Sequence, residues 1–436
     1  MPTIPRMLLR LSLVLILAAL AVTPGTGAAP AVRPEDAGMS SARLQRVHEL
    51  VERHVDAGSF SGAVTLVARG GRVVHFEAQG LMDLASKTPM ARDAIFRIMS
   101  MTKPIVGAAV LMLVEEGKIR LTDPVSKFIP ELKGLQVAVS QPGPAAPSPQ
   151  AAGAAAEPRV STVPAAREIT IRDLLTHTSG LVSGPISAQE NAKVALKGKE
   201  TLAEYVPRLA SVPLEFQPGT RWAYSAQAGF DVLVRVVEVA SGQRADRFFR
   251  ERLFEPLGMK DTFFYAPEPT TRLAALYRRT PAGLEPQANP AFMNGAYFSG
   301  GGGLMSTAED YFRFAQMLLD GGELNGRRLL APRTVELMRS PFVKDTLPGR
   351  PPGEGFGLSV RVITDPASRN TFLSEGTFGW SGAFGTHFWV DPRERVVGIL
   401  MAQTANQEIR PAFEDAVMQA IIEPLAPATL GRAQTN

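Results

Sequence analysis

The sequence contains no cysteine, which excludes disulfides, thiolate nucleophiles, zinc–thiolate sites and a lipid-modified N-terminal cysteine. Histidine is scarce as well. The five histidines show no metal-ligand spacing, so we predict no metal site and no cofactor. The formal net charge is only +4 and is scattered along the chain, which does not favour nucleic acid as a partner. The hydrophobic fraction of 45% and the charged fraction of 20% are typical of a globular protein with a sizeable core.

After residue 28 no apolar run is long enough to span a membrane. Before that residue, Arg6 and Arg10 precede the apolar residues 11–22, and small residues follow up to Ala28. This pattern is typical of a signal peptide, so we expect residues 1–28 to be cleaved near Ala28 and the mature domain, 29–436, to be exported to the periplasm or secreted. A retained membrane anchor is the alternative, and the short apolar run disfavours it. We expect no stable membrane span after removal of the signal.

Strand-like segments occur near both ends of the chain. Residues 62–80 predict two strands that turn at Gly70-Gly71, and the segments 355–363, 385–392 and 395–404 predict strands near the C-terminus, the last two joined as a hairpin at Asp391-Pro392. The simplest assembly is an α+β fold: one antiparallel β-sheet built from both termini, flanked by helices, with an inserted, mostly helical subdomain. The corresponding ranges are about 40–120 and 350–425 for the α/β part and about 121–349 for the helical part.

Apolar periodicity predicts helices in the ranges 40–57, 101–116, 228–241, 246–254 and 411–424. Three helix starts carry cap signals: Ser40 or Ser41, then Thr170, and then Ser306 with Glu309 as a capping box. Residues 134–167 are rich in proline and alanine with little apolar periodicity, and they predict a flexible insertion loop.

The segment "FRIMSMTKP" (96–104) places Ser100 and Lys103 at i and i+3, on one face of a helix. A serine hydroxyl is a weak nucleophile until a base takes its proton, and a lysine acts as a base only when its pKa lies well below about 10.4. The alternative is a helix cap followed by a solvent-facing lysine. Because the helix beyond Lys103 is apolar on every face, a free lysine there is unexpected.

Two further segments carry candidate chemistry. Tyr224, just before an apolar helix, would serve as the base if ionised beside Lys103. Its alternative is an ordinary core tyrosine. In residues 376–392, Gly379, Gly382 and Gly385 allow close backbone approach, and an N–H there would pair with the N–H of Ser100 around an oxyanion. The alternative there is a glycine-rich strand edge.

Three motifs stand in an order that resembles the serine β-lactamase and penicillin-recognising superfamily. They are "SMTK" (100–103), "YSA" (224–226) and "WSG" (380–382). Within that superfamily the chain is most similar to class C-like serine hydrolases, above all the family VIII carboxylesterases. Further matching segments extend the likeness over roughly residues 40–425: "LTDPVSKFIPEL" (121–132), "LLTHTSGL" (174–181), "LFEPLGM" (253–259) and "GGLMSTAED" (302–310).

The resemblance implies a β-lactamase/transpeptidase-like fold with Ser100 as the acylated nucleophile. It implies Lys103 and Tyr224 as the general-base pair, and the N–H groups of Ser100 and Ala383 as the oxyanion hole. The residues of "WSG", namely Trp380, Ser381 and Gly382, would line the substrate site.

Two departures from the family pattern bear on the substrate. Trp380 replaces the lysine that binds carboxylates in the family, and Ala226 replaces an asparagine that meets acylamido side chains. Both favour a small neutral ester over an anionic amide. The alternatives are a β-lactamase or D-alanyl-D-alanine carboxypeptidase, an acyltransferase, and an inactive penicillin-binding-like binding module. The oligomeric state stays open.

The histidines nearest these motifs receive no catalytic role. The sequence has no Gly-x-Ser-x-Gly elbow, so an α/β-hydrolase with His177 as its triad histidine has little support. We expect His177 to stiffen its loop through hydrogen bonds. His387 is expected on a strand near the site, without an assigned role.

Overall fold

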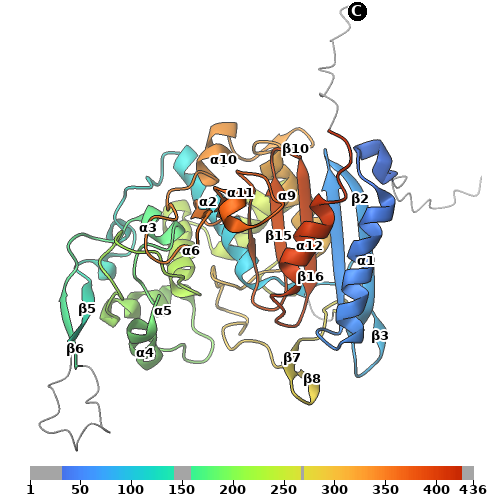
Figure 1. Ribbon diagram of the computed structural model, residues 1–436. Helices are drawn as coiled ribbons and strands as arrows, with labels where there is room; N and C mark the ends of the chain where they lie inside the picture. The colour runs from blue at the N-terminus through green and yellow to red at the C-terminus, as the bar shows by residue number, and fades with distance from the viewer. Residues whose placement is uncertain (1–31, 142–158, 267–269, 425–436) are drawn as a thin grey trace, which may run out of the picture. The chain divides into compact units, whose positions relative to one another are not determined.

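A computed structural model describes residues 32–141, 159–266 and 270–424. The predicted signal peptide and the middle of the predicted insertion, 142–158, lie outside the described residues. The centre of the fold is an eight-stranded antiparallel sheet with the order β12-β13-β14-β15-β16-β1-β2-β3 (Figure 1). Its strands are β1 (Gly62–Arg69), β2 (Arg72–Asp83), β3 (Thr88–Pro89), β12 (Glu354–Phe356), β13 (Arg361–Ile363), β14 (Phe378–Ser381), β15 (His387–Asp391) and β16 (Val396–Ala402).

The two ends of the described chain meet in the middle of this sheet. β1 pairs with β16 from Ala63 opposite Ala402 to Arg69 opposite Val396. On its other side β1 pairs with β2, and the turn between them uses Gly70 and Gly71, both with positive φ. The predicted α+β fold, with one antiparallel sheet drawn from both termini, is confirmed.

The prediction of one strand at 355–363 is wrong. The segment forms two short antiparallel strands, β12 and β13, which turn back at residues 357–360. Ser359 has a φ of 74°, and its N–H donates to the carbonyl of Leu175 at 2.9 Å. A tertiary hydrogen bond and a left-handed residue therefore interrupt what periodicity alone predicts as continuous.

Helices cover both faces of the sheet (Figure 1). α1 and α12 pack on one face with inward residues such as Val67 and Leu400, while α2 and α9 pack on the other with residues such as Leu66 and Ile399. Neighbouring residues of these strands thus point alternately into the hydrophobic cores on the two faces of the sheet, as expected for a strand buried on both faces. The helices are α1 (Ser41–Asp56), α2 (Thr102–Glu115), α3 (Ile171–Leu175), α4 (Pro185–Lys193), α5 (Leu202–Tyr205), α6 (Ala228–Ser241), α7 (Ala245–Phe249), α8 (Glu255–Leu257), α9 (Ala308–Leu319), α10 (Pro332–Met338), α11 (Pro366–Arg369) and α12 (Ile409–Met418).

Four two-stranded ribbons lie outside the large sheet. One of them forms the two ends of the predicted flexible insertion, 134–167, which are therefore ordered as paired strands. The ribbons are β4 (Phe96–Arg97) with β9 (Met305–Ser306), β5 (Gln136–Gln141) with β6 (Arg159–Pro164), β7 (Tyr277–Thr280) with β8 (Gly283–Pro286), and β10 (Glu323–Leu324) with β11 (Arg327–Arg328).

Two of the three predicted helix caps are found where expected. The side chain of Ser40 caps α1, and Thr170 caps α3 in a reciprocal box with Asp173. The predicted box of Ser306 with Glu309 is wrong by one residue: Thr307 caps α9 and accepts from the N–H of Asp310. Ser306 instead belongs to β9, where it pairs with Phe96.

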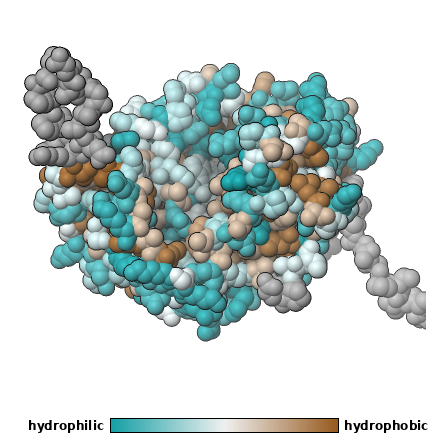
Figure 2. Space-filling model, turned by 90° about the horizontal axis from the view of Figure 1, so that it is seen from below, coloured by the Kyte–Doolittle hydropathy of each residue, from teal (hydrophilic) through white to brown (hydrophobic). Residues whose placement is uncertain are grey.

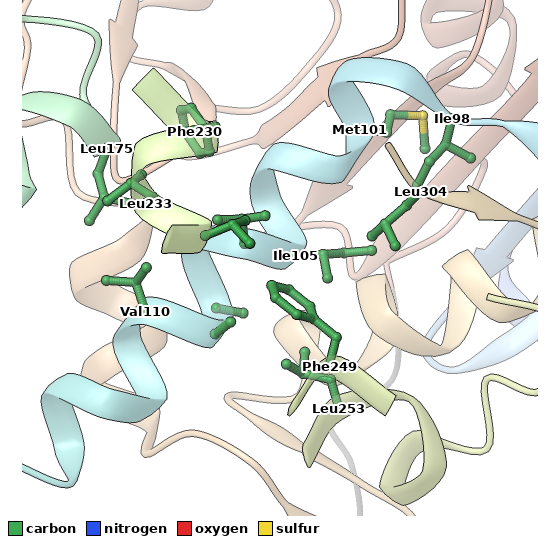
Figure 3. Packing of buried hydrophobic residues seen from close by; sticks show 14 of the residues in the cluster. Ile98, Met101, Ile105, Val110, Leu175, Phe230, Leu233, Phe249, Leu253 and Leu304 are labelled. Carbon is green, nitrogen blue, oxygen red and sulfur yellow. The ribbon is translucent and has the colours of Figure 1, made fainter. Parts of the chain in front are cut away.

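α2 is buried on every side. All of its residues from Thr102 to Leu113 lie in the interior. Figure 3 shows Ile105 and Val110 of this helix surrounded by apolar side chains from other elements, among them Leu233 of α6 and Phe249 of α7. The helix has no polar face, so any charged group on it must find its partners inside the protein.

Hydrophilic residues spread over most of the face shown in Figure 2, and hydrophobic residues gather there in small separate patches. Among residues 32–424, apart from the undescribed gaps, no helix is both long and apolar enough to cross a bilayer.

Candidate active site

Ser100 lies in a single 3-10 turn (Met99–Met101) that leads directly into α2. Met99, immediately before Ser100, has a φ of 47°, in the left-handed region that residues other than glycine rarely adopt. Such backbone strain persists where the surrounding structure fixes a functional geometry. The half-buried Ser100 is thus held on a constrained turn between β4 and the buried helix.

Lys103 lies one turn further along and is completely buried. Its Nζ donates to Ser100 Oγ at 3.2 Å and to the carbonyls of Ala226 and Gly301, both at 2.7 Å. These three acceptors match the three N–H groups of an ammonium. None of these three partners is a carboxylate, so Lys103 is held by three neutral oxygen acceptors, one of which is Ser100.

The phenol of Tyr224 reaches Ser100 from the opposite side. Its OH donates to Ser100 Oγ at 2.6 Å. Burial raises the pKa of Tyr224, but the positive charge of Lys103 and the hydrogen bond with Ser100 outweigh burial and bring this pKa below its ordinary value of 10. The structure therefore brings the three residues predicted from "SMTK" and "YSA" into one hydrogen-bonded group.

His177 supports Tyr224 rather than Ser100. Its carbonyl accepts from the N–H of Ala223 at 3.1 Å, and its Nδ1 accepts from the N–H of Ser225 at 3.2 Å. The imidazole also packs on the Tyr224 ring, with 4.7 Å between ring centroids. Burial, with the nearby charge of Lys103, lowers the pKa of His177 well below 6.5, so the ring is neutral. These bonds fit the expectation that His177 fixes its loop.

Ser100 and Tyr224 open into a cavity of about 400 Å³. The other predicted site residues line the same cavity: Trp380, Ser381, Gly382 and Ala383. Lys103 is absent from this lining, because it lies beneath Ser100 in the core. Residues from the first, second and third motifs are thus adjacent in space.

The end of β14 abuts the turn that carries Ser100. A Cβ on Gly382 would overlap both the carbonyl of Ile98 and Thr386 Oγ1, so only glycine fits there. The N–H of Gly382 donates to the carbonyl of Thr386 at 2.8 Å. This close approach places Ala383 on the cavity wall beside Ser100.

Four further lining residues escaped the sequence analysis: Glu354, Arg361, Gln407 and Arg410. Glu354 binds Arg350 and Arg369, whereas Arg410 donates to the carbonyl of Gly382 at 2.8 Å. None belongs to a recognisable motif. The one available signal was Arg361, the single charged residue in the predicted strand 355–363. The cavity therefore contains cations, Arg361 and Arg410, beside the apolar ring of Trp380.

No group of three or more histidine, aspartate or glutamate side chains in the described part of the chain is arranged to hold a metal ion. The hydroxyl of Ser100 has the phenol of Tyr224 and the amine of Lys103 as hydrogen-bond partners.

Comparison with known proteins shows which family the chain resembles. A family model described as Beta-lactamase matches residues 47–420. Esterase EstB of Burkholderia gladioli is 33% identical over 416 residues, covering 88% of this chain and 96% of the esterase. Protein Rv1367c of Mycobacterium tuberculosis is 38% identical over 371 residues, covering 80% of this chain and 87% of that protein.

Solved structures show the same likeness. EstCE1, described as a hydrolase with promiscuous acyltransferase activity, superimposes with a TM-score of 0.72 at 28% identity, covering 88% of this chain and 99% of that chain. The unliganded simvastatin synthase of Aspergillus terreus shares the fold, with a TM-score of 0.70 at 21% identity, covering 88% of this chain and 98% of that chain.

Proposed function

Because the chain belongs to the β-lactamase family of serine hydrolases, we propose that it cleaves small carboxylic esters through an acyl-enzyme on Ser100. One observation carries the proposal: Ser100 Oγ lies 2.6 Å from the phenol oxygen of Tyr224 and 3.2 Å from the Nζ of Lys103. Both separations are within the reach that proton transfer requires.

In the proposed mechanism, Tyr224 acts as a phenolate and takes the proton of Ser100 while Ser100 Oγ bonds to the ester carbonyl carbon. Lys103 stays an ammonium and stabilises the phenolate electrostatically. The N–H groups of Ser100 and Ala383 would hold the oxyanion. When the tetrahedral intermediate collapses, the bond to the alcohol breaks and Tyr224 returns its proton to the leaving oxygen. Water then attacks the acyl-enzyme by the same route, which releases the acid and restores Ser100.

Three observations support an ester substrate. Trp380 presents an apolar ring to the cavity, with its centroid 5.5 Å from that of Tyr224. Ala226 uses its carbonyl to hold Lys103 and has no amide side chain to offer an acylamido group. Among the relatives, EstB is named as an esterase.

Acyl transfer to an alcohol is the second candidate, because EstCE1 is described as having promiscuous acyltransferase activity. An alcohol replaces water only in the second half of the reaction, so the same acyl-enzyme serves both outcomes. Product analysis with a nitrophenyl ester and increasing methanol separates them: methyl ester formation indicates transfer, and free acid alone indicates hydrolysis.

The decisive test is labelling of the active serine. A fluorophosphonate probe should modify Ser100 and no other serine, as identified by mass spectrometry of the digested protein. Ser100→Ala should lose both labelling and turnover of nitrophenyl butyrate, while Ser86→Ala, on an exposed turn, should keep both. An unlabelled Ser100 in folded protein would refute the mechanism, and inertness to every acylating probe would favour a binding module. Faster turnover of nitrocefin than of esters would favour a β-lactamase.

Export belongs to the same proposal. The basic and apolar pattern of residues 1–28 supports cleavage near Ala28. N-terminal sequencing of the protein recovered from the periplasm or medium should begin close to residue 29. A protein that keeps its first residues in the cytoplasm would contradict export and leave the acyl-enzyme proposal intact.

A further inference from the structure

A chain of side-chain hydrogen bonds runs from the cavity wall into the interior. Ser381 Oγ lies 2.8 Å from His387 Nδ1, and His387 Nε2 lies 2.9 Å from Glu414 Oε1. Arg361 donates to the same carboxylate oxygen at 2.7 Å. Ser381 belongs to β14, His387 to β15, Glu414 to α12 and Arg361 to β13. The mechanism proposed above assigns no role to His387, Glu414 or Arg361.

The inner end of this chain fixes where its protons lie. Burial raises the pKa of Glu414, but the positive charge of Arg361 and the hydrogen bond from His387 outweigh it and hold this pKa at about 2. Glu414 is therefore a carboxylate near neutral pH and can only accept hydrogen bonds. It follows that Nε2 of His387 carries a proton and donates it to Glu414.

His387 has no second proton to offer. It is 1% exposed, and burial lowers its pKa below the ordinary 6.5 although Glu414 acts in the opposite direction. The ring is neutral, so Nδ1 bears a lone pair and accepts. The Trp389 ring stacks on it, with 5.6 Å between centroids, and limits its rotation. The hydroxyl proton of Ser381 is consequently engaged with His387.

Ser381 is half-buried and lines the cavity that contains Ser100. With its proton directed at His387, this hydroxyl presents only lone pairs to a substrate. We propose that Ser381 is a specificity-determining acceptor, held in that state by His387 as a positioning residue, and that it selects esters bearing a hydroxyl or N–H group against β14.

The order serine, histidine, glutamate is also that of a catalytic triad. A base must be able to take a proton near the working pH, whereas the buried His387 is disfavoured as an imidazolium. The arrangement is therefore suited to orienting the hydroxyl of Ser381 and poorly suited to making it a second nucleophile.

This inference rests on the proposed esterase function, and it is tested by ratios of kcat/KM within one protein. The probes are nitrophenyl butyrates that carry a hydroxyl at carbon 2 or 3, each compared with its methyl ether, which accepts but cannot donate. The wild-type protein should prefer the hydroxyl ester to its ether by about tenfold at one of these positions, the effect of one well-placed hydrogen bond. Unsubstituted nitrophenyl butyrate reports whether the protein is an esterase at all.

Two variants separate the acceptor role from simple space filling. Ser381→Ala should reduce the preference to about twofold or less. His387→Leu removes the acceptor for Ser381, while Glu414 keeps its ion pair with Arg361, so the freed hydroxyl can donate to the ether and the preference should also collapse. Ser86→Ala should keep the wild-type ratio. The inference is overturned if wild-type protein shows no preference at any position, or if folded His387→Leu retains it. If the wild-type protein does not turn over unsubstituted nitrophenyl butyrate at all, the esterase proposal itself is refuted.

Discussion

Replacing Tyr224 by phenylalanine removes one oxygen atom from the proposed active site and almost nothing else. The ring contacts with His177, at 4.7 Å between centroids, and with Trp380, at 5.5 Å, remain available to phenylalanine. The lost group is the hydroxyl that bonds to Ser100 Oγ at 2.6 Å. Ser100 keeps its other partner, the Nζ of Lys103.

The expected effects on stability and on rate therefore differ in size. One hydrogen bond contributes about 0.5–1.5 kcal/mol to the free energy of unfolding. In a chain of this size that corresponds to a melting-temperature change of about 2 °C or less. Loss of a general base lowers kcat/KM by about 10²- to 10⁴-fold. Tyr224→Phe should thus melt almost like the wild type and be nearly inactive.

The pH dependence provides an independent signature. A base must be deprotonated to act, so kcat/KM of the wild type should rise with pH through the pKa of Tyr224, which lies below 10 because Lys103 is close. The residual activity of Tyr224→Phe should lack this rise. Initial rates with nitrophenyl butyrate between pH 5 and about 9.5, with thermal melts at each pH, make the measurement.

Tyr277→Phe is the matched control, because that phenol donates to Asp83 at 3.1 Å in a different part of the fold. It should keep the wild-type rate and pH profile. A fully active Tyr224→Phe protein would refute the assignment of the base and would direct attention to Lys103 alone.

Three other substitutions probe the same region. Lys103→Met should move the rise of any residual kcat/KM to higher pH, because the pKa of Tyr224 increases without the adjacent cation, and it should lower the melting temperature since two backbone carbonyls lose their donor. An unchanged pH profile would contradict the coupling. Gly382→Ala should lower nitrophenyl butyrate turnover by at least about 100-fold, because its Cβ overlaps the carbonyl of Ile98 and displaces the wall beside the nucleophile; wild-type turnover in this variant would show that the wall tolerates displacement. Glu414→Gln should lower the free energy of unfolding by up to about 3 kcal/mol at pH 7, a difference that fades as the pH falls from 4.5 towards 2, where the wild-type carboxylate is itself protonated. Urea titrations at pH 7 and 3.5 measure that difference, and an equal loss at both values would contradict it.

The elements that sequence reasoning located correctly are those specified by neighbouring residues. The hairpin at Gly70-Gly71 and the apolar helix after Ser100 depend on local turn chemistry and local periodicity. Ser100, Lys103 and Tyr224 stand in short motifs, and the family pattern supplied their relation in space. In the structure, Lys103 and Tyr224 both lie within hydrogen-bond distance of the Ser100 hydroxyl.

The elements that it misplaced depend on distant residues. The turn between β12 and β13 exists because Ser359 bonds to Leu175 and packs against Gly107 of α2, where a Cβ would overlap it. By residue type serine is a slightly better cap than threonine, so the sequence favours Ser306; the pairing of β9 with β4 places Ser306 in a strand and leaves the cap to Thr307. The ion pair of Arg361 with Glu414 joins a strand to a helix far along the chain, so no spacing rule reveals it.

The pairing of β1 with β16 has a consequence for how the chain is made. The hydrogen bonds between residues 63–69 and 396–402 cannot form until nearly the whole polypeptide has been synthesised. Until then β1, buried along its entire length in the finished fold, has an open edge that can pair with another chain. Closing such a long loop is slow, and molecules truncated before β16 should aggregate instead of folding to a smaller stable core.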